Sequence, residues 1–197
     1  MVTLLDTDSS ARKAMIDCQL RTSGVTAPVV VKRLGEVPRE DFVPEAAKGI
    51  AYMDRAIALG EGKALAAPLV HGMLLQEARP KSDEHVIVID AGSGYLAELV
   101  RPLVGSIKVL SPAEAIAPTR GGKKADLIIV DGAIEHVPAN LAKRLGENGR
   151  IVTGLVQDSI TSVAIGRLSG KEVALRTTLE IGIPVLTEFD KPKGWSF

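Results

Sequence analysis

The stretch VIVIDAGSGYLAEL, residues 86–99, decides the fold. Its β-branched run Val86–Ile89 predicts a strand that is buried on both faces, and Tyr95–Leu103 predicts a helix. Gly92 and Gly94 stand where this strand turns into this helix. Glycine permits a close backbone approach that a Cβ would block, and a helix N-terminus offers free N–H groups. The turn therefore predicts a site for a nucleotide-type cofactor.

The glycine turn also has two other interpretations. Residues 92–97, GSGYLA, fit the GxGxxA pattern of dinucleotide-binding proteins, so a dinucleotide-binding protein is one further hypothesis. The other is a tight strand-to-helix turn that holds no ligand. The strand–turn–helix context favours a cofactor over an empty turn.

Strands and helices alternate through the second part of the chain. Further strands are predicted at Ser106–Leu110, Asp126–Val130 and Ile151–Leu155, and a helix at Ala139–Leu145. Such alternation implies a parallel sheet whose two faces are covered by right-handed crossovers. The tail, residues 159–189, alternates in the manner of antiparallel strands with a hairpin turn at residues 169–171.

The first part of the chain is mainly helical. Residues 1–80 are predicted to form a helical cap packed on a core of residues 81–197, the two making one compact unit. Residues 37–44, VPREDFVP, are predicted to be an extended connector, because two prolines flank an apolar pair. The other elements expected here are helices at residues 8–23, 27–34 and 68–78 and a turn at residues 59–62.

Composition and charge restrict the class of function. The 197 residues include 24 Lys+Arg and 24 Asp+Glu, and aromatics make up only 3%. A neutral chain with few aromatics gives no reason to expect nucleic acid or a membrane surface as a partner. Cys18 is the only cysteine and the three histidines lack metal-ligand spacing, so neither a disulfide nor a metal is expected. No signal-peptide pattern and no long apolar run occur, so the expected location is cytoplasmic.

Several segments around the glycine turn resemble the protein-L-isoaspartate O-methyltransferase family. They occur in family order over residues 15–155, and VPREDFVP and the QLR helix are quite specific. A dinucleotide dehydrogenase is not expected to carry this N-terminal block, so the resemblance favours S-adenosylmethionine as the cofactor. The segments are MIDCQLRTSGV (15–25), VPREDFVP (37–44), AYMD (51–54) leading to LGEG (59–62), DLIIVDGA (126–133), VP (137–138) and LGENGR (145–150).

The resemblance implies an α/β fold and a reaction. The fold is a Rossmann-like S-adenosylmethionine-dependent methyltransferase sheet, with parallel strands, a C-terminal antiparallel hairpin and an N-terminal helical cap. In the reaction a methyl group passes to the α-carboxylate of an isoaspartyl residue, and the ester collapses to a succinimide, which allows repair. The implied partner is a damaged protein or peptide, and a homo-oligomer is left open. No catalytic triad is expected, because a carboxylate is already a nucleophile at neutral pH and needs only desolvation and alignment.

The resemblance places the cofactor around the glycine turn and the ends of the neighbouring strands. Asp90 either occupies a family glycine position or is the acid two residues before the first glycine, which would lie near the methionine amino group. Asp131 ends a predicted strand and is expected to point toward the cofactor edge of the sheet. Each of these two acids could equally cap a loop N–H. The cofactor-binding candidates are Asp90, Ala91, Gly92, Ser93, Gly94, Tyr95, Ser111, Asp131 and Gly132.

The sequence departs from the family at the second strand of the sheet. The family carboxylate that hydrogen-bonds the ribose hydroxyls is replaced by Ser111. A charged hydrogen bond contributes about 1.5–3 kcal/mol, so losing two would weaken cofactor binding by roughly 100-fold or more. Glu114 lies nearby, and a capping box with Ser111 is favoured over a substitute ribose contact.

A second departure is the short connection at residues 111–125. These residues are too few for the helix, strand and loop that the family places there. We therefore expect one edge strand to be missing, a short helix that ends by Pro118, and an adenine pocket open on one side. The loop TRGGKK, residues 119–124, is predicted to be a solvated basic connector in preference to a substrate clamp.

The third departure lies in the substrate site. The family motif Thr-Ile-Ser-x-Pro is replaced by ALAAP, residues 64–68, so the hydroxyls that would orient the substrate carboxylate are absent. The family substrate-site positions are Ala66, Pro68 and His71, and none is identified as catalytic. A helix-packing role for His71 is favoured over hydrogen bonding to substrate. The three departures motivate the alternative of a catalytically degenerate relative that acts as a binding or scaffold module.

Overall fold

The computed structural model describes residues 10–119, 121–170 and 172–191. A six-stranded sheet with the order β4-β3-β5-β6-β7-β8 forms its centre. The strands from β3 to β6 pair in parallel, and β7 and β8 add an antiparallel hairpin. This confirms the predicted methyltransferase-like sheet. The strands are β3 (His85–Ile89), β4 (Ser106–Leu110), β5 (Ala125–Ile134), β6 (Leu145–Gln157), β7 (Ile160–Ser169) and β8 (Glu172–Glu180).

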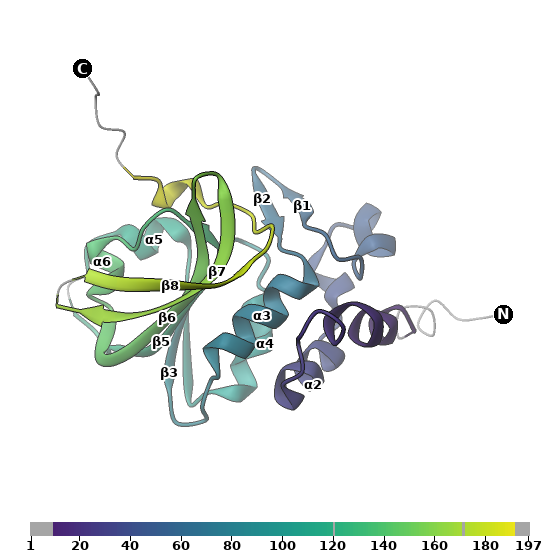
Figure 1. The fold of residues 1–197 in the computed structure, drawn as a ribbon, viewed down its shortest axis with the longest axis horizontal. Helices are drawn as coiled ribbons and strands as arrows, with labels where there is room; N and C mark the ends of the chain where they lie inside the picture. The colour runs from purple at the N-terminus through teal and green to yellow at the C-terminus, as the bar shows by residue number, and fades with distance from the viewer. Residues whose placement is uncertain (1–9, 120, 171, 192–197) are drawn as a thin grey trace, which may run out of the picture.

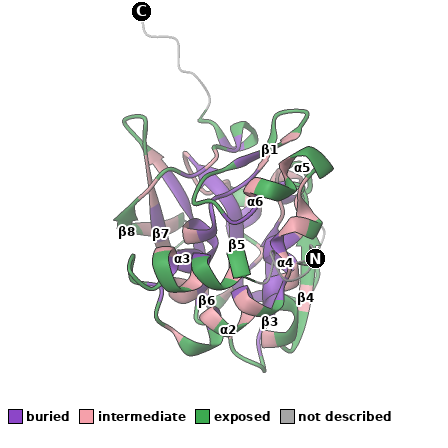
Figure 2. Cartoon of the chain, turned by 90° about the vertical axis from the view of Figure 1, so that its right-hand side faces the viewer, coloured by how far each residue is buried: buried purple, intermediate pink, exposed green. Residues whose placement is uncertain are grey.

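Helices cover both faces of the sheet (Figure 1). Val86 and Val88 on β3 pack into the core beneath α3 (Pro68–Ala78) and α4 (Tyr95–Val100). Ile87 and Ile89 point to the opposite face, where they join the second core cluster under α5 (Pro112–Ile116) and α6 (Ala139–Ala142). The continuous apolar run of β3 is therefore explained by burial on both sides. Figure 2 shows α4 as largely buried, whereas the loops at the sheet ends are exposed.

The short connection after β4 forms α5 and a loop. Within the described residues, no strand pairs with the outer edge of β4, so the expected loss of an edge strand is confirmed. The helix α5 ends at Ile116, two residues before Pro118. The sheet therefore ends one strand away from the glycine turn that follows β3.

The N-terminal part packs on α3. Leu20, Leu34 and Leu74 share one core cluster with Val86. Residues 8 and 9 of the first predicted helix lie outside the described residues, and the division at residue 80 stays a prediction. The elements are a helix from residue 10 with a π-helical part at Met15–Leu20, α2 (Pro28–Glu36), 3-10 helices at Arg39–Phe42 and Glu45–Ile50, and the hairpin β1 (Ile57–Gly60) and β2 (Lys63–Leu65).

Four local predictions were wrong. Residues 37–44 are not extended throughout, because Arg39–Phe42 form a 3-10 helix that turns Arg39 inward. The helix from Tyr95 gives way to a 3-10 helix, Arg101–Leu103, which contains Pro102. The helix α6 ends at Ala142, because Leu145 already pairs with Ala125 in the sheet. The tail beyond β8 forms a bridge from Val185 to Ala133 and a short 3-10 helix, Thr187–Phe189, in place of a strand.

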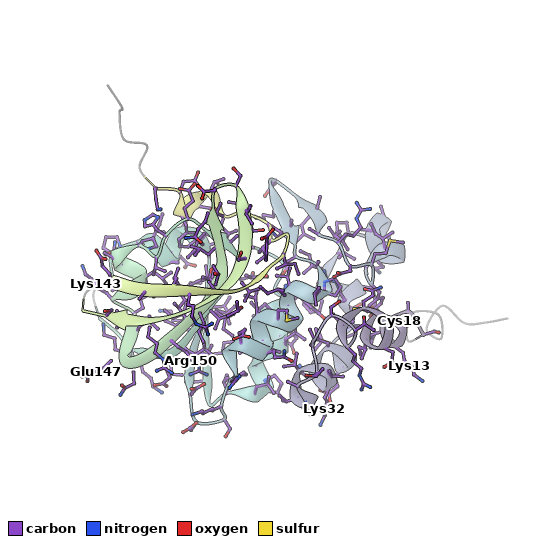
Figure 3. The ribbon with its side chains drawn as sticks, viewed as in Figure 1. Lys13, Cys18, Lys32, Lys143, Glu147 and Arg150 are labelled. Atoms are coloured by element: carbon purple, nitrogen blue, oxygen red, sulfur yellow. The ribbon has the colours of Figure 1, made fainter. Side chains whose placement is uncertain are left out.

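The amino end of the sheet is held by one arginine. Arg150 on β6 lies beside the end of α3 (Figure 3) and donates to Ala78 O at 2.8 and 2.6 Å. It also donates to both carboxylate oxygens of Glu84, at 2.6 and 3.0 Å. Burial alone would raise the pKa of Glu84, but hydrogen bonds from Arg150 and the Lys81 N–H outweigh it and lower that pKa. The far end of α3 is therefore fixed to the sheet. No helix among the described residues is long and apolar enough to cross a membrane.

Candidate cofactor and substrate site

The loop between β3 and α4 is shaped by its two glycines. Gly92 has φ +104° and Gly94 has φ +74°, a region that side chains with a Cβ rarely adopt. Asp90 accepts a hydrogen bond from the Gly94 N–H at 2.9 Å, and the Ser93 hydroxyl accepts one from the Tyr95 N–H at 3.1 Å. Two side chains of the loop thus fix its turn into the helix.

A cavity of about 570 Å³ opens at the carboxyl ends of β3 and β4. Its walls are residues 61–64 at the β1–β2 hairpin, residues 90–92, residues 109–112 with Glu114, and residues 184–188. Four of the cofactor-binding candidates line it, namely Asp90, Ala91, Gly92 and Ser111. Ser93, Gly94, Tyr95, Asp131 and Gly132 are not on its wall.

The cavity wall is rich in carboxylates. Glu61, Asp90, Glu114 and Glu188 line it, and Lys63 is the single cation among the described lining residues. Burial raises the pKa of Asp90, an effect that the Gly94 N–H opposes and the nearby charge of Asp131 reinforces. The cavity therefore suits a ligand that carries positive charge and hydroxyl groups.

Glu114 closes a capping box at the start of α5, as predicted. Its Oε2 accepts from the Ser111 N–H at 2.8 Å, and the Ser111 hydroxyl accepts from the Glu114 N–H at 3.3 Å. Hydrogen bonds donated to Oε2 by the Ser111 N–H and by the Ser111 hydroxyl, both at 2.8 Å, lower the pKa of Glu114. Its Oε1 has no hydrogen-bond partner among the described residues, although the side chain lines the cavity.

Gly132 shapes the cavity because residues 184–188 of the tail pack closely against it. A Cβ at Gly132 would lie 2.6 Å from Leu186 Cγ, so only glycine lets the tail pack here on β5. Ala133 fixes the same tail, because its N–H donates to Pro184 O and its carbonyl accepts from the Leu186 N–H, both at 2.8 Å. The cavity wall at residues 184–188 depends on this close contact.

Asp131 and His71 meet in a buried network behind the loop. Both side chains are buried, and His71 Nε2 lies 3.0 Å from Asp131 Oδ1. His71 Nδ1 lies 3.2 Å from the Arg39 guanidinium. A guanidinium only donates, so Nδ1 accepts and the Nε2–H donates to Asp131, which defines a neutral imidazole. The other carboxylate oxygen of Asp131 accepts from the Ser93 hydroxyl at 3.3 Å.

Arg39 is the network residue that sequence reasoning missed. It is completely buried, donates to Ala51 O at 2.8 Å and to Ala66 O, and stacks 5.1 Å from the Tyr95 ring centroid. Burial lowers the pKa of Arg39 and raises that of Tyr95 to about 12. The only available signal was a charged residue inside the specific motif VPREDFVP.

The family substrate-site positions are buried beside this network. Ala66, Pro68 and His71 are all buried, and both ring nitrogens of His71 have protein partners. The helix-packing interpretation of His71 agrees with this placement. Within the replaced motif, residues 64–68, Ala64 reaches the cavity wall.

Comparison with known proteins places the chain in a family. The family model for protein-L-isoaspartate(D-aspartate) O-methyltransferase (PCMT) matches residues 10–116. A protein-L-isoaspartate O-methyltransferase 2 from Anaeromyxobacter sp. (strain Fw109-5) is 30% identical over 172 residues, which are 74% of this chain and 70% of the relative. A protein-L-isoaspartate O-methyltransferase 1 from Rhodopseudomonas palustris (strain HaA2) is 25% identical and covers 95% of this chain and 86% of its own.

Solved structures share the fold. A beta-aspartate methyltransferase (PCMT) structure from Plasmodium falciparum, in complex with S-adenosyl-L-homocysteine, superimposes with a TM-score of 0.67 at 16% identity. It covers 92% of this chain and 98% of its own. Another, of a protein-L-isoaspartate O-methyltransferase, has a TM-score of 0.64 at 14% identity and covers 89% of this chain and 65% of its own. The chain belongs to the protein-L-isoaspartate O-methyltransferase family.

Proposed function

We propose that the chain is an S-adenosylmethionine-dependent carboxyl methyltransferase acting on isoaspartyl residues of damaged proteins. One observation carries this proposal in a chain of this family: the 570 Å³ cavity between the glycine loop and the β1–β2 hairpin. In open α/β sheets, ligands bind outside the carboxyl ends of the strands, where this cavity lies. The comparisons give no support to the alternative of a degenerate binding or scaffold module.

The residues of the cavity fit the cofactor. We assign Asp90 to the amino group and Glu114 to the ribose hydroxyls, because its Oε1 has no partner among the described residues. The bare backbone of Gly92 gives room for close approach, and Lys63 Cδ lies 2.8 Å from the place of a Cβ there. The flexible Lys63 side chain therefore covers the glycine and has to shift when a ligand binds. When bound, S-adenosylmethionine supplies an electrophilic methyl group.

The chain's own residues then have to position two reactants. A substrate carboxylate oxygen bonds to the methyl carbon as the carbon–sulfur bond breaks, and the bonding electron pair stays on sulfur. The products are a methyl ester and a neutral thioether, so no proton moves and no general base is required. Alignment and exclusion of water are the tasks left to the protein. The buried network of Arg39, His71 and Asp131 serves these tasks by holding α3 and the glycine loop together.

Binding and transfer test the proposal together. Calorimetry with S-adenosylhomocysteine is expected to show one site per chain, and radiolabelled methyl groups are expected to appear on an isoaspartyl peptide. The aspartyl peptide of the same sequence is the matched control and should stay unlabelled. Absence of heat at millimolar ligand, together with absence of label, contradicts the proposal. The dinucleotide hypothesis predicts that the fluorescence of reduced nicotinamide cofactor changes when the protein is added. We expect this fluorescence to stay unchanged. The cytoplasmic location stays a prediction.

A further inference from the structure

We propose that Lys63 binds the isoaspartyl carboxylate of the substrate, in place of the hydroxyl side chains that are absent at Ala64 and Ala66. This inference rests on the proposed function and names the residue that recognises its substrate. It follows from the position of Lys63, from its weak pairing in the protein alone and from the absence of another cation among the described residues that line the cavity.

Lys63 is well placed for this contact. It is the first residue of β2 and lines the cavity beside Gly92, so its flexible side chain can move off the glycine when the methyl donor binds and still reach a carboxylate there. Its side chain is 52% exposed, so its ammonium group can be reached from solvent. The group therefore stands at the boundary between the cofactor cavity and the outside, where a substrate carboxylate has to enter.

The ammonium group is weakly engaged in the protein alone. Its ion-pair partner is Glu61 Oε2 at 3.5 Å, on a side chain that is 87% exposed. Exposed pairs of this kind contribute little to stability, because water screens them and two long side chains have to be ordered. A desolvated substrate carboxylate can therefore displace Glu61 at small cost.

The donors of the buried network, Arg39 and His71, are already used within the protein. Arg39 is completely buried and directs its guanidinium to Ala51 O, Ala66 O and His71. His71 has protein partners at both ring nitrogens. Among the described residues that line the cavity, Lys63 is the single cation, and the remaining charges are carboxylates that would repel the substrate.

The change in charge during the reaction predicts how the loss of Lys63 affects KM and kcat. An ammonium group adds the attraction of a full opposite charge to its hydrogen bond with the carboxylate, so Lys63 can take the place of the absent hydroxyl donors. The negative charge of the carboxylate disappears as the ester forms. Lys63 therefore stabilises the bound substrate more than the transition state, and its loss should raise KM while kcat stays unchanged or increases slightly.

The test compares Lys63→Met with Lys63→Arg. Fluorescence anisotropy of a labelled isoaspartyl peptide, with and without S-adenosylhomocysteine, gives the peptide Kd independently of turnover. We expect Lys63→Met to raise the peptide Kd and KM by about 10- to 100-fold, to change kcat by less than about threefold and to leave the S-adenosylhomocysteine Kd within about threefold. Lys63→Arg should retain most of the peptide affinity.

Two controls make the outcome specific. Lys32→Met replaces a lysine on α2 whose side chain is 73% exposed, and it should change neither the peptide Kd nor KM. A peptide in which the isoaspartyl carboxylate is an amide should bind the wild type and Lys63→Met equally weakly. The inference is overturned if Lys63→Met leaves the peptide Kd unchanged or weakens only the binding of S-adenosylhomocysteine. In that case, methyl transfer by the wild type still supports the proposed function. A wild type that binds no isoaspartyl peptide at millimolar concentration overturns the inference as well, whereas failure of S-adenosylhomocysteine binding and labelling counts against the proposed function.

Discussion

The buried network and the cavity wall use charged residues in opposite ways. In the network, each guanidinium nitrogen of Arg39 has a protein acceptor, and His71 is bonded on both sides. On the cavity wall, Glu114 keeps one oxygen unpartnered among the described residues and Lys63 has only an exposed Glu61. A buried polar group that is fully hydrogen-bonded stabilises the fold, whereas an exposed charged group at a cavity with free hydrogen-bonding atoms can exchange water for a ligand. Satisfaction of hydrogen bonds therefore separates structural from ligand-binding positions here.

Replacing Arg39 should break the network and cause the largest loss in the free energy of unfolding. Arg39→Met removes the donors of two buried carbonyls and of His71, and leaves the buried carboxylate of Asp131 without the nearby cation. We expect a loss of about 3–5 kcal/mol in the free energy of unfolding, measured by urea denaturation. Arg21→Met, at a side chain that is 58% exposed, is the control and should cost less than about 0.5 kcal/mol. A loss below about 1 kcal/mol for Arg39→Met would mean that the network does not hold α3 and the glycine loop together.

Replacing Asp90 should move stability and binding in opposite directions. The raised pKa means that the fold favours the neutral carboxyl, so the contribution of Asp90 to stability is present at low pH and is lost as pH rises through its folded-state pKa. Asp90→Asn keeps an acceptor for the Gly94 N–H and should raise the melting temperature at pH 7. This gain should vanish below the ordinary pKa of aspartate. Calorimetry should show about tenfold weaker S-adenosylhomocysteine binding. A lower melting temperature at pH 7 would show that the charge stabilises the loop.

Replacing Glu114 should give the smallest change in stability. Glu114→Gln retains an acceptor for the Ser111 N–H, so the melting temperature should stay nearly unchanged. Calorimetry should show S-adenosylhomocysteine binding about 3- to 10-fold weaker, because a charged hydrogen bond to the ribose becomes neutral. Unchanged affinity would restrict Glu114 to its capping role.

The sequence predicts most of the sheet because local patterns dominate there. The β-branched run of β3 and the helical period of residues 68–78 gave the strand and helix that the structure has. The 3-10 helix around Arg39 was missed, because its cause is a set of acceptors at residues 51, 66 and 71, distant in the sequence. The tail was mistaken for a strand, because its pairing with Ala133 overrides its alternating pattern.

In the candidate site too, the residues set by a local pattern were predicted and those set by distant contacts were not. Asp90, Ala91, Gly92 and Ser111 reach the cavity wall, because strand ends in a parallel sheet are predictable from the strands themselves. The wall at residues 61–64 and 184–188 was not predicted, because no local pattern indicates that a hairpin and a tail fold over the glycine loop. The burial of Asp131 likewise depends on α3, which supplies His71.

The outer edge of β4 is open to pairing with a strand of another chain. With no further strand paired there among the described residues, its backbone N–H and C=O groups form an open template for another chain. The strand is only five residues long, and the exposed Lys108 stands at its centre. Short length and a central positive charge are common defences against edge-to-edge aggregation. The shortened crossover thus exposes backbone that the chain protects with one lysine.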